Sequence, residues 1–193
     1  MSYKKIKSIL FALFCAVFST AAWSAERTYD VQVLIFSHLT PQTVSAEQWP
    51  ILSDTQINAF SNNKITSANS AYGLQSEIKT LQNNPDYQVL YSGSWKETWS
   101  GDNTSVSIPF SNNNNLQGRI TIVLGHYFDV HANLLFSTPT AALQKLDTSG
   151  YFNHISQSTF YFSLSQDRRM RSRELNYLSE PVLGMIIKMI PMQ

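Results

Sequence analysis

The feature that most limits the possible folds of this chain is a repeated alternation of apolar and polar residues. In the best example, residues 28–36, the side chains of Val31, Val33 and Ile35 would share one face, because successive side chains of a strand point to opposite faces. Similar strands are predicted at residues 87–95, 118–130, 159–165, 175–178 and 182–189, with 133–136 continuing the third strand as a hairpin and 179–181 forming a turn. Strands and helices do not alternate along the chain, so the pattern favours an α+β fold with a largely antiparallel sheet.

One helix is predicted, at about residues 66–82. Leu74, Ile78 and Leu81 recur there at the spacing of one helical face, and Pro85 closes the segment because the residue before a proline is biased away from helical geometry. Polar connections are predicted at residues 40–64, 100–117 and 137–156. Neither a fixed-period repeat nor a shift in composition divides the chain, so we expect one folded domain.

The first 24 residues have the order of a secretory signal peptide, with a basic start, an uncharged apolar core and small residues before the cleavage point. Cleavage is expected near Ser24 or Ala25, which leaves a periplasmic domain of residues 25–193. A membrane-spanning helix needs about 20 apolar residues, and this core has roughly half of that. An uncleaved membrane anchor is therefore the minority alternative.

Removal of this segment changes the chemistry of the chain. The only cysteine, Cys15, is lost together with three lysines and no acid, so the formal net charge changes from +1 to −2. A chain without cysteine forms no disulfide and depends on its apolar core for stability. A near-neutral charge gives no reason to expect nucleic acid as a partner, and no later stretch is long enough to cross a membrane.

The sequence contains none of the local motifs that mark an enzyme or a metal protein. The histidines have no metal-binding spacing, and neither a nucleophile elbow nor a glycine-rich phosphate loop is present. They are His38, His126, His131 and His154. We therefore expect no cofactor and no catalysis, although carboxylates that converge only in three dimensions, as in a wall hydrolase, would leave no such spacing.

Aromatic residues near residues 87–99 provide one candidate for ligand binding. Tyr87, Tyr91 and Trp95 alternate with polar residues, which favours a core position for these three. Trp99 lies in a polar stretch and is the better candidate for stacking on a sugar ring.

A dense group of arginines provides the other candidate. Four of the six arginines that remain after cleavage are Arg168, Arg169, Arg171 and Arg173. They form either a solvated hairpin edge, where charge prevents strand pairing, or a grip for carboxylates and phosphates. Strand alternation would place Arg169, Arg171 and Arg173 on one face and Arg168 on the other.

The segment 162–185 resembles the C-terminal signature of the periplasmic peptidoglycan-binding proteins called CsiV. The similarity covers the Arg-Arg-Met-Arg-Ser run from Arg168, the Glu-Leu-x-Tyr run from Glu174 and the Pro-x-x-Gly run from Pro181. The signal peptide, the first strand and the Trp49-Pro50 pair are also similar. Asn176, Ser179 and Glu180 depart from the pattern, because the family usually has His at the first position and Asp-His at the other two.

The resemblance implies a non-enzymatic periplasmic protein that binds peptidoglycan. It also implies a role in cell-wall assembly, through an outer-membrane lipoprotein that activates a penicillin-binding synthase. The candidate ligand-binding residues are Arg168, Arg169, Arg171, Arg173, Glu174, Tyr177 and Trp99. Two alternatives remain open: a protein–protein adaptor in which the arginines pair with Glu174 or other acids, and a wall hydrolase.

Overall fold

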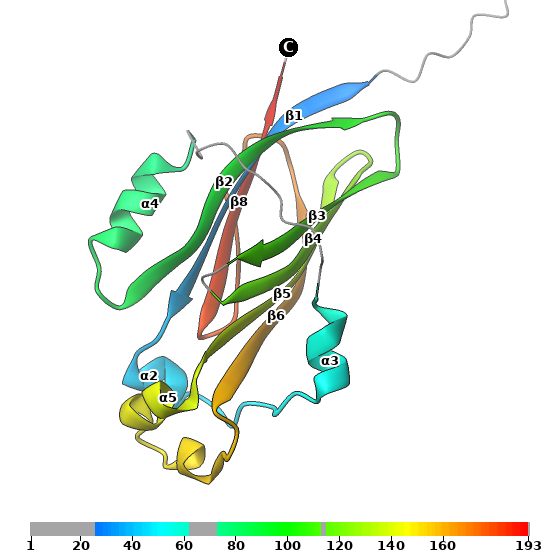
Figure 1. Ribbon diagram of the computed structural model, residues 1–193. Coiled ribbons are helices and arrows are strands. Elements are labelled where there is room, and N and C mark those ends of the chain that lie inside the picture. Colours follow the sequence, from blue (N-terminus) through cyan, green and yellow to red (C-terminus); the bar gives the residue numbers. More distant parts are fainter. Residues whose placement is uncertain (1–25, 62–72, 113–114, 193) are drawn as a thin grey trace, which may run out of the picture.

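The computed structural model describes residues 26–61, 73–112 and 115–192, and these residues form two antiparallel sheets with short helices around them (Figure 1). The predicted signal peptide, residues 1–24, lies outside the described residues. The strands are β1 (Arg27–His38), β2 (Tyr87–Trp99), β3 (Thr104–Asn112), β4 (Leu116–Leu124), β5 (Phe128–Pro139), β6 (Thr159–Met170), β7 (Asn176–Ser179) and β8 (Leu183–Pro191). The helices are α2 (Pro41–Val44), α3 (Asp54–Ala59), α4 (Gln75–Gln82), α5 (Thr140–Leu146) and the 3-10 helix η1 (Tyr151–His154).

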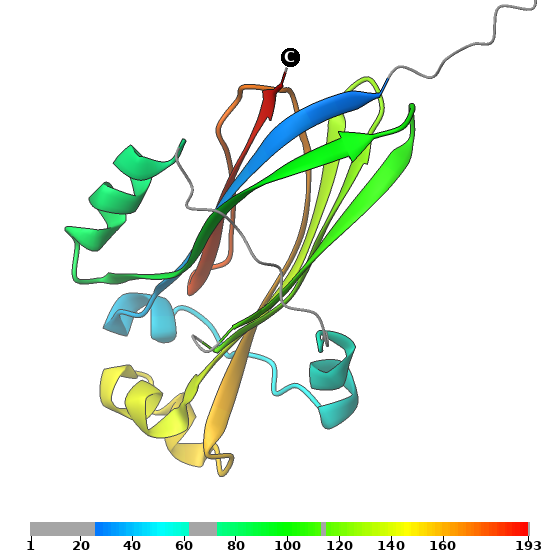
Figure 2. The same cartoon turned by 45° about the horizontal axis from the view of Figure 1, so that its top comes forward.

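The strands are arranged as two four-stranded sheets. The first sheet has the order β2-β1-β8-β7 and the second has the order β3-β4-β5-β6. All the strand pairs are antiparallel. The chain passes from one sheet to the other between β2 and β3 and again between β6 and β7, as the turned view shows (Figure 2). The expected α+β fold with largely antiparallel sheets is confirmed.

One core lies between the two sheets, and strand alternation determines which side chains enter it. Val31, Val33 and Ile35 of β1 and Ile120 and Ile122 of β4 are fully buried in the same cluster. The residues between them in sequence point to the outer faces. The predicted inward face of residues 28–36 is therefore confirmed.

The edges of the two sheets are joined by side chains at one side of the molecule. The Gln166 side-chain amide of β6 donates to the Ser179 carbonyl of β7 at 2.7 Å and accepts from the Ser179 N–H at 3.1 Å. An amide that makes both bonds acts as one more rung of a strand ladder. This rung covers part of the open edge that β7 would otherwise expose.

Two predictions about the second sheet are wrong. Residues 100–117 were expected to be a polar loop, but β3 occupies half of them, and its Ile108 and Phe110 point into the core. Residues 118–130 were expected to be one strand, but a turn separates β4 from β5, with the Gly125 N–H donating to the Tyr127 carbonyl at 2.9 Å. Apolar residues keep the same alternation across this turn, so the pattern hides it.

The predicted face of β2 is also partly wrong. Trp95 and Tyr91 pack against the core, as expected, but Tyr87 packs on the outer face of the first sheet. The register between β1 and β2 shifts between Ile35 and Phe36. A bulge of this kind adds one residue to a strand and reverses the facing of the residues beyond it.

The helical content was underestimated, because residues 40–64 and 137–156 contain α2, α3, α5 and η1. Two of these helices begin with a reciprocal capping box, at Thr40 and at Ser53, which stabilises helices too short to show periodicity. The predicted helix at 66–82 is confirmed from Gln75, and residues 66–72 lie outside the described residues. This helix, α4, covers the outer face of the first sheet around Leu34 and Phe36.

Within the described ranges, no helix has the length and apolar character needed to span a membrane.

Candidate ligand-binding surface

The arginine segment lies where β6 ends and the chain turns towards β7. Only Arg168 and Arg169 belong to the strand, since β6 ends at Met170. Arg173 has a left-handed backbone with φ of 67°, and its N–H donates to the Met189 carbonyl of β8 at 2.7 Å. The turn is thus held against the first sheet, and strand alternation does not determine how Arg171 and Arg173 point.

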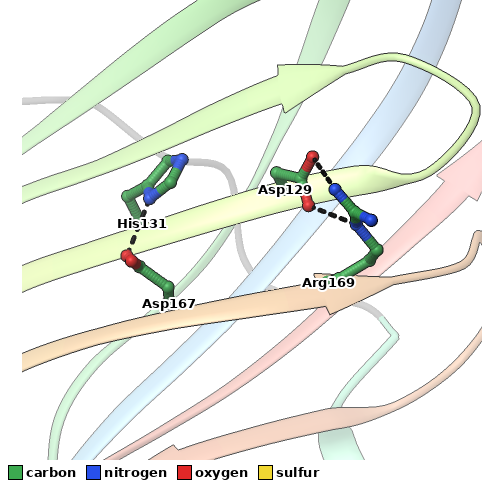
Figure 3. Close-up of polar contacts among 4 residues, drawn as sticks. All are labelled: Asp129, His131, Asp167 and Arg169. Atoms are coloured by element: carbon green, nitrogen blue, oxygen red, sulfur yellow. Dashed lines mark hydrogen bonds and ion pairs between the residues drawn. The ribbon is translucent and has the colours of Figure 1, made fainter.

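Arg169 lies on the outer face of the second sheet, opposite Asp129 of β5 (Figure 3). Its guanidinium donates two hydrogen bonds to this carboxylate, at 2.7 and 3.1 Å. The bonds lower the pKa of Asp129 and raise the pKa of Arg169. A fork that already holds a carboxylate in this way has little capacity for another one.

A second cross-strand pair lies beside it on the same face. His131 Nδ1 and the Asp167 carboxylate are 2.7 Å apart, and both side chains are largely exposed. Figure 3 shows the two pairs side by side on β5 and β6. Such exposed pairs contribute little to stability, so this face is a solvated sheet surface with matched charges.

Arg168 points to the other side of β6, as strand alternation predicts. Its Nε donates to Asn176 Oδ1 of β7 at 3.4 Å, and Asn176 is buried. The Asn176 side chain also donates to the Glu174 carbonyl. Arg168 therefore helps to join the two sheets, next to the rung formed by Gln166.

Among the described residues, the Arg171 guanidinium forms no ion pair of the kind that Arg169 makes and no hydrogen bond to an amide of the kind that Arg168 makes. Its guanidinium lies over the Tyr127 ring, 5.6 Å from the ring centre. Its pKa is raised, first by a hydrogen bond with the Tyr127 hydroxyl and then by the nearby charges of Tyr127 and Glu174. Among the described residues, Arg169 is the only arginine of this segment in an ion pair. Within the described part of the chain, Arg171 and Arg173 thus have no carboxylate in ion-pair contact, although the charge of Glu174 acts on Arg171 from nearby.

The turn between β4 and β5 brings further residues to this end of the molecule. We call the hollow found here the hairpin-tip pocket. Its volume is about 360 Å³, and it is lined by Arg27, Tyr29, Leu124, His126, Tyr127, Phe128, Arg171 and Ser172. The sequence pattern did not predict that Arg27 and Tyr127 line this pocket, because the turn that holds Tyr127 was expected to be strand.

Trp99 does not belong to this surface. It is 1% exposed, and its ring makes edge contacts with Tyr29 and Phe128, each with 5.8 Å between ring centres. Its indole N–H donates to the Ile122 carbonyl at 3.4 Å. The expectation that Trp99 presents its ring to a ligand is therefore wrong. The cause is that β2 continues to Trp99 and points this side chain inwards.

Tyr177 and Glu174 are exposed but lie on different parts of the surface. The Tyr177 ring is stacked on Phe36 on the outer face of the first sheet, with 6.1 Å between ring centres. A Glu174 carboxylate oxygen accepts the Arg171 backbone N–H at 3.3 Å and stabilises the turn. The seven predicted residues thus divide among the turn, the junction between the sheets, the outer faces and the core.

A search of the described residues for three or more His, Cys, Asp or Glu side chains that could hold a metal ion found none. His126 lies in the β4–β5 turn and His131 lies on the outer face of the second sheet.

Comparison with protein families gives one match. The model of the family described as "Peptidoglycan-binding protein, CsiV" matches residues 51–192, which is well over half of the chain. Comparisons with curated proteins and with solved structures gave no significant match. The chain belongs to the CsiV family.

Proposed function

We propose that this member of the CsiV family binds peptidoglycan through the turn after β6, with Arg171 and Arg173 as the contacts for carboxylates of the stem peptides. The family description supports the ligand. The observation that supports the turn after β6 as the binding site is the guanidinium of Arg171. This group is exposed, lies over the Tyr127 ring and has no carboxylate in ion-pair contact among the described residues. Arginine forks match carboxylates in geometry as well as in charge.

We further propose that the protein acts in the periplasm after loss of residues 1–24, and that it binds the wall without cleaving it. In this hypothesis it supports cell-wall assembly together with an outer-membrane lipoprotein that activates a penicillin-binding synthase. The signal-like order of residues 1–24 supports export, and the absence of catalytic motifs in the sequence supports a binding role.

The test is co-sedimentation with isolated sacculi, using protein recovered from the periplasm after expression of the whole chain. The wild type should pellet with the sacculi at low salt and be released as salt is raised, because exposed ion pairs are screened. Arg171→Ala combined with Arg173→Ala should weaken binding about tenfold or more, if the two ion pairs contribute about 1.4 kcal/mol together.

The matched control is Arg119→Ala, which removes an exposed arginine from the middle of β4. It should leave co-sedimentation unchanged. Wild-type protein that stays in the supernatant at low salt would contradict the proposal. Release of soluble muropeptides during the incubation would contradict the non-enzymatic part of it.

A second candidate function is a protein–protein adaptor, and one observation favours it. Leu175 is 51% exposed just before β7, and Tyr177 is 54% exposed within this edge strand, two positions further along the chain. Large exposed apolar side chains close together in sequence, at the edge of a sheet, are typical of protein contacts. Cross-linking in the periplasm would then recover a wall synthase or its lipoprotein, and Leu175→Ser with Tyr177→Ser would abolish the cross-link without affecting sacculus binding.

A further inference from the structure

We infer that the hairpin-tip pocket holds a free carboxylate that is attached to a short aliphatic group, as at the C-terminus of a peptide stem. The inference rests on the proposed function, because it names the part of peptidoglycan that this end of the molecule would recognise. It goes further in assigning the site to Arg27, Tyr127 and Arg171, which come from three separate elements.

The base of the pocket is apolar and fixed by the core. Tyr29 packs edge-on against Phe128, with ring centres 4.9 Å apart, and against the buried Trp99. Leu124 and Phe128 are each 2% exposed. Residues held in this way keep their positions when a ligand enters, and the partly exposed Tyr29 ring is the apolar surface that an aliphatic group meets.

The rim of the pocket is cationic and held in place by hydrogen bonds. Arg27 forms an ion pair with Asp102 and donates to the Gly125 carbonyl at 3.4 Å. Arg171 lies over Tyr127, and its own backbone N–H is bound by Glu174. Side chains held before binding lose less conformational entropy when the ligand arrives.

The two arginines of the rim differ in what they can offer. Arg27 already shares its charge with Asp102, so it mainly shapes the pocket. Arg171 contacts an aromatic ring instead of an acid, so its charge remains available to an anion. Because a guanidinium over a ring face keeps its N–H groups around its edge, it can contact the ring and a carboxylate at the same time.

The size and chemistry of the pocket limit the ligand. About 360 Å³ is near the low end of the roughly 300–1,000 Å³ range of small-molecule sites, which suits one or two short residues rather than a glycan strand. Two larger hollows, of about 550 and 570 Å³, are lined by Asp54 and by Glu47 and contain no arginine. An anionic ligand would be repelled there and attracted to the hairpin tip.

The experiment is a titration of the protein, followed by NMR, with acetyl-D-alanyl-D-alanine and with the C-terminal amide of the same peptide. The acid should shift the amide resonances of Gly125 and Ser172, and the amide derivative should bind at least tenfold more weakly because it lacks the charge. Arg171→Gln should reduce the affinity for the acid by tenfold or more and leave the weak affinity for the amide unchanged. Arg119→Gln, the matched control, should change neither.

Several outcomes would overturn the inference. Equal binding of acid and amide would show that no carboxylate is recognised, and an Arg171→Gln variant with normal spectra and unchanged affinity would exclude the pocket. Tyr127→Phe gives a second variant that keeps the ring under Arg171 but removes the hydroxyl whose interaction raises the pKa of Arg171, and a loss of affinity of several-fold is expected. If sacculi bind the wild type but the peptide acid does not, the inference fails while the proposed function stands. If the acid binds and sacculi do not, the proposed function fails.

Discussion

Replacement of Trp99 by alanine separates a core residue from a ligand-binding one. The side chain is 1% exposed, and burying an aromatic of this size removes about 150–250 Å² from water. At about 25 cal/mol per Å², this corresponds to about 4–6 kcal/mol, which is an upper limit because unfolded chains already bury some surface. Allowing for partial collapse of the cavity, we expect Trp99→Ala to lower the free energy of unfolding by about 3–5 kcal/mol.

Urea unfolding followed by circular dichroism measures this loss, and thermal unfolding should show a midpoint lower by about 6–20 °C for a chain of this size. Thr98→Ala is the matched control, since Thr98 is the exposed neighbour of Trp99 on the same strand and should cost no more than about 0.5 kcal/mol. Sacculus binding by the folded fraction should persist in Thr98→Ala, and Trp99→Ala should reduce it only in part, because Trp99 supports Tyr29 and Phe128 while the arginines of the turn remain. A Trp99→Ala protein that loses less than about 1 kcal/mol but no longer binds sacculi would refute this reasoning.

Three further predictions concern other parts of the fold. Gly118→Ala should lower the free energy of unfolding by about 2–5 kcal/mol in urea titrations, because φ is +133° there and a Cβ would lie 2.2 Å from the Asn133 carbonyl oxygen. Asp147→Ala should lower the free energy of unfolding by about 2–3 kcal/mol in thermal unfolding, because the Asp147 carboxylate accepts four hydrogen bonds. Burial raises the pKa of this carboxyl, but the hydrogen bonds lower it by more. Sacculus binding should stay normal. The pKa of Asp129 is lowered by Arg169, so the stability advantage of the wild type over Asp129→Asn should be present at neutral pH and disappear as pH falls below the usual carboxyl value of 3.8; an advantage that grows in acid would contradict this assignment.

The structure gives physical reasons for parts of the C-terminal signature. Gly184 lies opposite Phe36, and a Cβ on Gly184 would come within 2.6 Å of the Phe36 ring. The same ring stacks on Tyr177. The glycine and the tyrosine of the signature therefore serve the packing of the outer face of the first sheet.

The positions at which the chain departs from the family pattern also have structural partners. Asn176 accepts from Arg168, while Ser179 and Glu180 both bind the Gln166 side chain, with Glu180 Oε1 at 3.0 Å. All three positions thus lie at the junction of the two sheets. We expect the departures to alter this junction more than the surface of the turn after β6.

The candidate site could be predicted from the sequence only in part. The group of Arg168, Arg169, Arg171 and Arg173 is visible in the sequence, and it did mark the end of the molecule where Arg171 and Arg173 lie without an ion-pair partner among the described residues. Their different roles were not visible, because Asp129 is separated from Arg169 by 40 positions and becomes its partner only when β5 pairs with β6. Trp99 was misjudged for a related reason: neighbours in sequence are polar, but neighbours in space are not.

The sequence by itself determined the class of fold, since alternation within a strand is a local property that follows from backbone geometry. It also determined the first strand and its buried face, and the resemblance that the family comparison confirms. Only the tertiary structure decided where the chain turns between β4 and β5 and on which face of the first sheet Tyr87 lies beyond the bulge. It also decided which arginines of the segment form an ion pair with an acid. These depend on the register between strands, and register is set by contacts between residues far apart in the chain.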